Sequence, residues 1–165
     1  MFQIPDDSGF LAIVVPNTYS SFVDNDWEFD QLMNHFHQQM MTKSLLIWGT
    51  GSEGLWNVEV RKRKSSAQGF REVSGPIQVV GGEVLITNYE NLTMAAQFET
   101  VQLPQKHEID QIESIANGDY VCRIVQMFDP EKQEAAVEGI ADFVVEFFKA
   151  KTLIKPWSKV PWFSD

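Results

Sequence analysis

The sequence predicts a mainly β fold with one or two helices, either an antiparallel β-sandwich or an open barrel with a covering helix. Two observations lead to this class. Many short apolar segments alternate with a period of two and are separated by turn residues, a pattern typical of sandwiches and barrels. One segment has a strong helical period. The length of 165 residues fits a single domain, 1–165, with a Trp/Pro-rich tail at 155–165.

The first two expected elements are a strand and a helix. Phe10–Val15 is a short apolar run that Pro16 ends, as expected of a strand. Asn25 is expected to cap the helix, because Glu28 follows it by three residues as in a capping box. The helix then presents one apolar stripe, formed by Phe29, Leu32, Met33, Phe36 and Met40.

Strand-like segments follow this helix. Segment 45–48 is a short apolar run, and segment 56–60 alternates between apolar and polar residues. Gly81-Gly82 is expected to form the two-residue turn of a β-hairpin. The strands of that hairpin are expected at 77–80 and 84–87.

The second half of the chain adds three expected strands. Segment 94–98 alternates with a period of two, and segment 120–128 is nearly continuous in apolar residues, which is typical of a central strand. Segment 131–150 allows two interpretations, because its alanines and glutamates favour a helix and its later β-branched and aromatic residues favour a strand. We expect a loop or short helix and then a strand from Ala141.

The charge of the chain restricts its partners. There are 13 Lys and Arg against 23 Asp and Glu, a formal net charge of −10. Binding to nucleic acid over a broad surface is not expected, because neutralisation of phosphates by basic residues supplies most of that affinity. A membrane contact is not expected either, and a basic protein is the predicted partner. The acidic N-terminus and the short first apolar run predict a cytoplasmic protein without a secretory signal or membrane span.

Few residues suit metal or nucleophilic chemistry, since the chain has three histidines and one cysteine. His35 and His37 lie two apart and do not share a helix face, so they are interpreted as surface or edge histidines. Cys122 lies in the middle of an expected strand and is interpreted as a buried structural thiol. We therefore predict no metal, no cofactor and no catalytic residue, and an enzyme is the less favoured class.

Two short motifs resemble ligand sites. Segment 49–54 spells G-x-G-x-x-G, but a dinucleotide site needs a helix next, and segment 55–62 has the period of a strand. A glycine-rich hairpin turn is expected there instead. Arg61–Lys64 is a basic run, which we interpret as a solvated strand end and loop rather than as a phosphate-binding patch.

Acidic residues around the helix start are the main candidate for binding a partner. Acids favour helix N-termini because the helix dipole is positive there, but four acids in seven residues exceed what capping requires. We predict that these residues face a basic partner. They are Asp24, Asp26, Glu28 and Asp30. A second acidic candidate group consists of Glu108, Asp110 and Glu113.

The C-terminal tail contains two Pro-Trp pairs, which supply Trp157 and Trp162. In an exposed tail these side chains form a partner-binding or homodimer patch, because tryptophan is favoured at binding hot spots. In a tail that folds back they seal the sheet. We include both tryptophans among the predicted partner-binding residues.

Segment 117–122 resembles a feature of immunoglobulin domains. Gly118, Tyr120 and Cys122 have the spacing of the tyrosine corner, in which the tyrosine stands two residues before the second cysteine. The partner cysteine of that family is missing here. The resemblance implies that the Tyr120 hydroxyl bonds backwards to the chain.

A second resemblance concerns the order of segments between Ser74 and Phe128, which is similar to that of small bacterial competence-associated nuclease inhibitors. The segments that carry it are Gly75–Val79, Val84–Ile86, Ala96–Phe98 and Gly118–Tyr120. The Leu-Pro pair that usually precedes the Gly-Asp-Tyr turn of the family is displaced here to Leu103-Pro104. The resemblance implies an acidic inhibitor or immunity protein that blocks a basic enzyme, and it identifies no functional residue.

The predicted function is therefore that of an acidic protein-binding module, a bacterial inhibitor or immunity protein that occludes the basic active-site cleft of its partner. The alternative is a small apolar-ligand carrier or an enzyme on a β-barrel scaffold, because 12 Phe and 5 Trp can line an apolar pocket. A third hypothesis is an assembly subunit that uses the Pro-Trp tail to form a homodimer.

Overall fold

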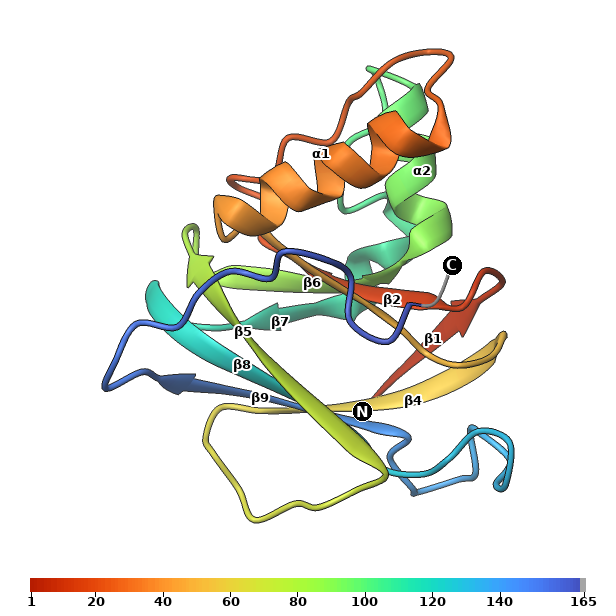
Figure 1. The fold of residues 1–165 in the computed structure, drawn as a ribbon, viewed down its shortest axis with the longest axis vertical. Helices are drawn as coiled ribbons and strands as arrows, with labels where there is room; N and C mark the ends of the chain where they lie inside the picture. Colours follow the sequence, from red (N-terminus) through yellow and green to blue (C-terminus); the bar gives the residue numbers. More distant parts are fainter. Residues whose placement is uncertain (164–165) are drawn as a thin grey trace.

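Two β-sheets lie face to face, and two helices cover one of them (Figure 1). The structure is a computed structural model that describes residues 1–163. The five-stranded sheet has the order β1 (Phe2–Asp6), β4 (Gly54–Arg61), β9 (Phe143–Lys149), β8 (Gly118–Gln126) and β5 (Arg71–Val79). The four-stranded sheet has the order β3 (Leu45–Gly49), β2 (Phe10–Val14), β6 (Glu83–Asn88) and β7 (Ile112–Ser114). The helices are α1 (Phe29–Met41), α2 (Tyr89–Gln97) and the 3-10 helix η1 (Lys106–Gln111).

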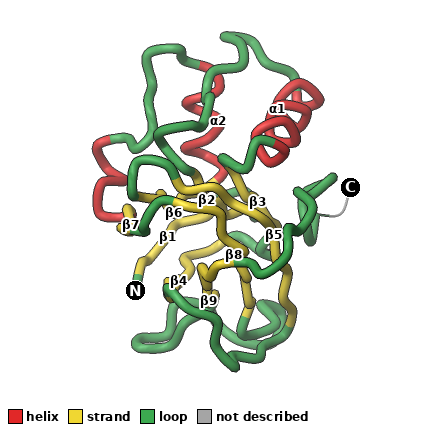
Figure 2. The backbone as a smooth tube through the Cα atoms, turned by 90° about the vertical axis from the view of Figure 1, so that its left-hand side faces the viewer, coloured by secondary structure: helices red, strands yellow, loops and turns green. Residues whose placement is uncertain are grey.

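The predicted fold class is confirmed in its sandwich form, because the two sheets are separate and do not close into a barrel. Strand pairs are antiparallel except for β4 and β9, which run parallel. Figure 2 shows the helices on one side of the strands and long loops on the opposite side. In the described residues 1–163, no helix combines the length and the apolar character that crossing a membrane would need.

The apolar core has two parts, and the four-stranded sheet separates them. On β2, Leu11 and Ile13 belong to the cluster between the sheets, whereas Ala12 and Val14 belong to the cluster under the helices. Since successive side chains of a strand point to opposite faces, this strand is buried on both faces. Its continuous apolar sequence therefore follows from its position in the middle layer of three.

Most of the expected strands are confirmed. The runs at 10–15, 45–48 and 56–60 correspond to β2, β3 and β4. Segment 120–128 forms β8, an interior strand between β9 and β5. The strand interpretation of the 131–150 segment is also confirmed, because β9 begins at Phe143 and the residues before it form turns and loops.

The prediction that Asn25 caps the helix is wrong. The N-cap of α1 is Glu28, and its capping box partner is Gln31, whose side chain accepts from the Glu28 backbone N–H at 2.8 Å. Asn25 lies instead in a turn, where the Asp24 carboxylate accepts from the Asp26 backbone N–H at 3.0 Å. Aspartate side chains favour such local turns, which compete with helix formation.

The expected strand at 94–98 is also wrong, because these residues lie in and after α2. Asn88 caps this helix, and its side chain accepts from the Asn91 N–H at 2.9 Å. The helix buries Leu92, Ala95 and Ala96, which are spaced for a helical face. Over so few residues, the apparent period of two at 94–98 did not distinguish a strand from a helix.

Both glycine-rich turns were expected to close hairpins, and both instead carry the chain from one sheet to the other. Gly81-Gly82 connects β5 to β6, and the 50–53 segment connects β3 to β4. Gly81 and Gly82 have φ values of +89° and +73°, which favour glycine. A turn between two sheets and a hairpin turn both need residues with positive φ, so both favour glycine. The sequence alone therefore does not distinguish them.

The tail folds back along the side of the sandwich where the edge strands β3 and β5 lie. Trp157 contacts both core clusters, and its Nε1 donates to the Ser74 carbonyl of β5 at 2.8 Å. A Cβ on Gly75 would lie 2.7 Å from the Trp157 ring, so the glycine makes room for the indole. Gly49 of β3 donates its N–H to the Pro161 carbonyl at 2.9 Å. The tail thus covers one edge of each sheet, β5 of the five-stranded sheet and β3 of the four-stranded sheet.

Candidate functional site

The helical layer carries most of the net negative charge of the molecule. Residues 15–44 and 88–111, which include both helices and η1, hold only two basic residues, Lys43 and Lys106. The same two segments hold eight acidic residues, Asp24, Asp26, Glu28, Asp30, Glu90, Glu99, Glu108 and Asp110. The layer therefore accounts for more than half of the net charge of −10. Basic residues are concentrated instead in the loops and strands of the five-stranded sheet and in the tail.

The four predicted acids at the start of α1 are exposed. In the described part of the chain, none of the ion pairs involves them. Glu28 has a structural role as the N-cap, and Asp30 lies in the first turn, where the dipole favours an acid. Asp24 and Asp26 lie before the helix, so capping alone does not explain them.

The loop before α1 is fixed against the end of α2. The backbone N–H groups of Val23 and Asp24 both donate to the Ala96 carbonyl, at 2.8 and 3.1 Å. The loop that leads into α1 (Figure 1) therefore lies against the end of α2. The acids of the loop are thereby brought to the same end of the helical layer as the residues that end α2.

Large apolar side chains are exposed at this end. Phe29 is 48% exposed, Phe22 38% and Phe98 43%. We call this surface the acidic end, and it consists of Phe22, Asp24, Asp26, Glu28, Phe29, Asp30, Phe98 and Glu99.

A groove of about 490 Å³ adjoins the acidic end, between α1 and the tail. Phe29 and Asp30 belong both to the acidic end and to the groove. The residues that line it are Phe29, Asp30, Met33, Asn34, His37, Met40, Ser158, Lys159, Val160 and Phe163. The structure therefore brings the predicted acidic cluster next to the predicted tail, although 124 residues lie between Asp30 and Lys155 in the sequence.

The two predicted tryptophans contact different strands or loops of the sandwich. Trp157 is partly exposed, and its indole N–H is bonded to β5. Trp162 is also partly exposed, and its ring stacks on the Arg71 guanidinium at 4.4 Å. Trp162 and Phe163 line a second, smaller groove of about 270 Å³ beside the glycine-rich 49–53 segment. Both tryptophans fix the tail in place, and binding of a partner by them stays a prediction.

The second acidic candidate group does not form one exposed face. Glu108 is fully buried, where its carboxylate accepts from the Thr87 hydroxyl and from the Gln105 backbone N–H. Glu113 forms an ion pair with Lys62 at 3.6 Å. The sequence suggested an exposed group because three acids recur within six residues, but Glu108 is needed inside to cap η1. This prediction is therefore wrong for Glu108.

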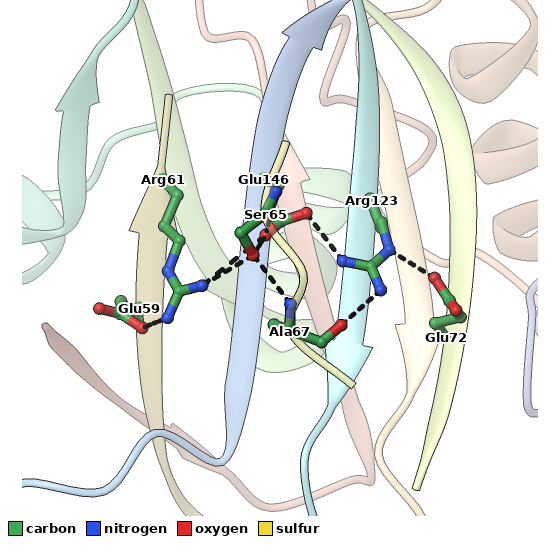
Figure 3. A network of polar contacts seen from close by, with 7 residues as sticks. All are labelled: Glu59, Arg61, Ser65, Ala67, Glu72, Arg123 and Glu146. Atoms are coloured by element: carbon green, nitrogen blue, oxygen red, sulfur yellow. Dashed lines mark hydrogen bonds and ion pairs between the residues drawn. The ribbon is translucent and has the colours of Figure 1, made fainter. Parts of the chain in front are cut away.

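A buried polar network, which sequence reasoning missed, lies on the outer face of the five-stranded sheet (Figure 3). Arg123 of β8 and Glu146 of β9 are directly opposite each other in the strand register. Arg123 Nη1 donates to Glu146 Oε1 at 2.9 Å, and Nη2 donates to the Ala67 carbonyl at 2.6 Å. Arg123 Nε donates to the Glu72 carboxylate. The sequence signal for this network was the presence of a single charged residue, Arg123 or Glu146, within each of two otherwise apolar segments.

The same network ties the basic loop to the sheet. Ser65 donates its backbone N–H to Glu146 Oε2 at 3.1 Å, and its hydroxyl also bonds this carboxylate. Arg61 Nη1 donates to the Ser65 hydroxyl at 2.8 Å, and Arg61 pairs with Glu59. Beyond Arg61, the basic residues Lys62, Arg63 and Lys64 are exposed, which confirms the interpretation of a solvated strand end and loop.

The charges of this network stabilise one another. Burial by itself favours the neutral form of Glu146, but the hydrogen bonds from Ser65 and Arg123 outweigh it and hold the pKa of Glu146 below its ordinary 4.5. The hydrogen bond to Glu72, followed by that to Glu146, raises the pKa of Arg123. Each of the two buried charges of the network, Arg123 and Glu146, is therefore paired with an opposite charge and with further hydrogen-bond partners.

The single cysteine and one of the two helix histidines are buried. Cys122 is fully buried, as predicted, and burial raises the pKa of its thiol. His35 is buried rather than at the surface, since its ring packs on Tyr19 with centroids 5.8 Å apart, and burial lowers the pKa of His35. Across residues 1–163, no group of three or more His, Cys, Asp or Glu side chains is placed to hold a metal ion.

Two other expectations are settled by the local structure. The strand β4, not a helix, follows the G-x-G-x-x-G segment, so the arrangement that a dinucleotide site requires does not form. The Tyr120 hydroxyl donates to the Ala116 carbonyl at 2.7 Å, as the tyrosine-corner resemblance implied.

Comparison with known proteins identifies a fold but no family. No family model matches the chain, and no curated protein matches its sequence. A solved structure described as "Crocagin biosynthetic gene J" is similar with a TM-score of 0.62 and 11% identity, covering 89% of this chain and 94% of that chain. The chain therefore shares the fold of that protein.

A second solved structure is ComJ from Bacillus subtilis, described as an inhibitor of the DNA degrading activity of NucA. Its TM-score is 0.47 with 8% identity, covering 88% of this chain and 92% of that chain. ComJ is a nuclease inhibitor, the class to which the sequence resemblance pointed. Because this TM-score is below 0.5, the assignment of the fold rests on the first structure.

Proposed function

We propose that this protein is a protein-binding module, an inhibitor or immunity protein of bacterial type, which binds a basic partner through the acidic end. The observation that carries the proposal is the gathering of unpaired acids and exposed aromatic side chains at one end of the helical layer. Asp24 and Asp26 supply charge without a capping role, and Phe22, Phe29 and Phe98 supply apolar contact area.

This combination suits the recognition of a basic surface. Acidic side chains attract a basic partner over a distance and raise the association rate, particularly at low salt. Exposed aromatic residues then supply contact energy once water is excluded. In the proposed complex the carboxylates occupy the basic cleft of the partner and keep its own substrate out.

The tail contributes to the same surface in this proposal. Lys159, Val160 and Phe163 form one wall of the groove whose other wall begins at the acidic end. Trp157 and Trp162 hold that wall in position and present their partly exposed edges beside it. We propose that both tryptophans support the binding of the partner in this way.

The alternative of an apolar-ligand carrier on a barrel has less support. The space between the sheets is filled by a cluster of buried side chains that includes Trp48, Trp56 and Phe143. The aromatic residues that suggested an apolar pocket are therefore used to pack the two sheets together.

The proposal is tested by capture from lysate of the native host with two baits, the natural chain and the triple variant Asp24→Asn, Asp26→Asn, Asp30→Asn. Glu28 is kept because it caps α1. We expect one basic protein to bind the natural chain at low salt, to be released by high salt, and to bind the variant weakly. Binding of the same protein to both baits at every salt concentration would show that the acidic end is not the binding surface.

If neither bait captures a protein, an apolar dye is titrated into the natural chain while tryptophan emission is recorded. A saturable shift of the emission would favour the ligand-carrier alternative.

A further inference from the structure

The groove between α1 and the tail is large enough to receive a side chain of a bound segment, and it has an apolar lining. Its volume of about 490 Å³ lies within the range of about 300–1,000 Å³ that is usual for ligand sites. Met33 and Met40 of α1 face Val160 and Phe163 of the tail across it. Methionine side chains adapt to apolar groups of different shape. The groove is therefore suited to an apolar group that arrives from outside.

The charges around the groove indicate which kind of partner carries the apolar side chain that enters it. The α1 wall begins with Phe29 and Asp30, which also belong to the acidic end. Asp30 is the acid on this wall, and the helical layer to which the wall belongs holds eight acidic and two basic residues. Lys159 is the base that lines the opposite wall. A segment that enters beside Asp30 is favoured if it carries a positive charge there.

We propose that the groove takes an apolar anchor side chain from a segment of the basic partner, while a neighbouring lysine or arginine of that segment contacts Asp30 and the other acids of the acidic end. This inference rests on the proposed function and adds to it the chemistry of the bound segment. Recognition by an anchor in a pocket with charges beside it is common in peptide grooves.

The test uses three capped pentapeptides as probes of the full chain, labelled with ¹⁵N and observed by NMR. The first alternates lysine and leucine, the second alternates lysine and serine, and the third alternates glutamate and leucine. We expect the lysine–leucine peptide to shift the amide signals of 29–40 and 158–163. It should bind at least about tenfold more tightly than the lysine–serine peptide, because leucine burial supplies this much. The glutamate–leucine peptide should not bind.

A matched pair of variants locates the anchor. Met33→Gln changes a partly exposed groove residue, and Leu55→Gln makes the same kind of change on β4, in the other sheet. We expect Met33→Gln to weaken the lysine–leucine peptide about fivefold, as the loss of part of one buried side chain predicts, and to leave the lysine–serine peptide unchanged. Leu55→Gln should change neither affinity.

The outcomes separate this inference from the proposed function. Equal affinity for the lysine–leucine and lysine–serine peptides would overturn the groove inference and leave the acidic end as the binding surface. Signal shifts confined to residues outside the groove would also overturn it. If the glutamate–leucine peptide bound as tightly as the lysine–leucine peptide, the preference for a basic partner would fail, and the proposed function with it.

Discussion

The acidic end of the helical layer and the buried network of the five-stranded sheet both contain carboxylates, in opposite circumstances. At the acidic end, Asp24 and Asp26 are exposed and lie outside the ion pairs of the described residues. In the network, Glu146 is fully buried and bonded to Ser65 and Arg123. An ion that is buried must be paired to be tolerated, whereas an exposed one is free to meet a partner. Charged residues thus serve folding in one region and are available for binding in the other.

The largest effect is expected from removing the buried carboxylate. Glu146→Ala leaves the guanidinium of Arg123 short of one partner and frees Ser65, so the free energy of unfolding should fall by about 3 kcal/mol. Asp26→Ala, the matched change at the acidic end, should alter it by less than about 0.5 kcal/mol. Urea unfolding at neutral pH measures both. Equal losses in the two variants would remove the distinction between the regions.

A somewhat smaller effect is expected from the tail. Trp157→Ala removes the hydrogen bond to Ser74 and contacts with both core clusters, which should cost about 2 kcal/mol of unfolding free energy. Leu153→Ala is the control, because Leu153 is 84% exposed. Thermal unfolding measures whether the tail stabilises the fold, and size-exclusion chromatography measures whether it forms a homodimer. If deletion of the residues after Ile154 lowered only the oligomeric state, the assembly hypothesis would replace the structural role.

The acidic end should affect association more than stability. In the variant Asp24→Asn, Asp26→Asn, Asp30→Asn, the rate of association with the captured partner should fall about tenfold at low salt. The difference should shrink at high salt, because exposed charges are screened within about 10 Å at 0.1 M salt. Surface plasmon resonance at several salt concentrations measures these rates, and circular dichroism checks that the fold is intact. A faster dissociation with unchanged association would contradict this role.

The smallest effect is a dependence of stability on pH. The pKa of Glu146 is lower in the folded chain than its ordinary 4.5, so its ionised form stabilises the fold at higher pH. This contribution is complete above pH 4.5 and is lost as the pH falls through the folded pKa. The Glu146→Gln variant should lack it, so its unfolding free energy should fall less between neutral and acid pH than that of the natural chain. Parallel pH curves for the two proteins would show that Glu146 does not contribute in this way.

The strands were the most predictable part of the fold. A period of two over 56–60 and the apolar runs at 10–15 and 120–128 reflect burial on one face or on both, which is a property of the segment itself. The α1 stripe was predictable for the same reason, since Leu32, Phe36 and Met40 all lie on its buried face. The alternation at 94–98 misled because α2 is only nine residues long and buries small alanines.

For the candidate site, the acids and the tryptophans could be predicted from the sequence, but their positions relative to one another could not. Asp24 to Asp30 are visible as a local cluster, and the Pro-Trp pairs are visible as a local composition. Asp30 and the tail residues Ser158, Lys159, Val160 and Phe163 line one groove only because the tail returns across β3 and β5 to α1. Exposed Phe22 and Phe98 could not be told from core residues, because aromatic residues are usually buried.

By itself, the sequence determined the apolar periodicity, the acidic charge and the small number of histidines and cysteines, since these depend on residue types and their local spacing. The tertiary structure decided which strands pair, that the glycine turns pass between sheets, and which acids are paired. Glu108 and Glu146 are buried while Asp24 and Asp26 are exposed, although all four are carboxylates. The partners that make burial of a charge tolerable come from distant strands and loops, and only folding brings them within hydrogen-bonding distance.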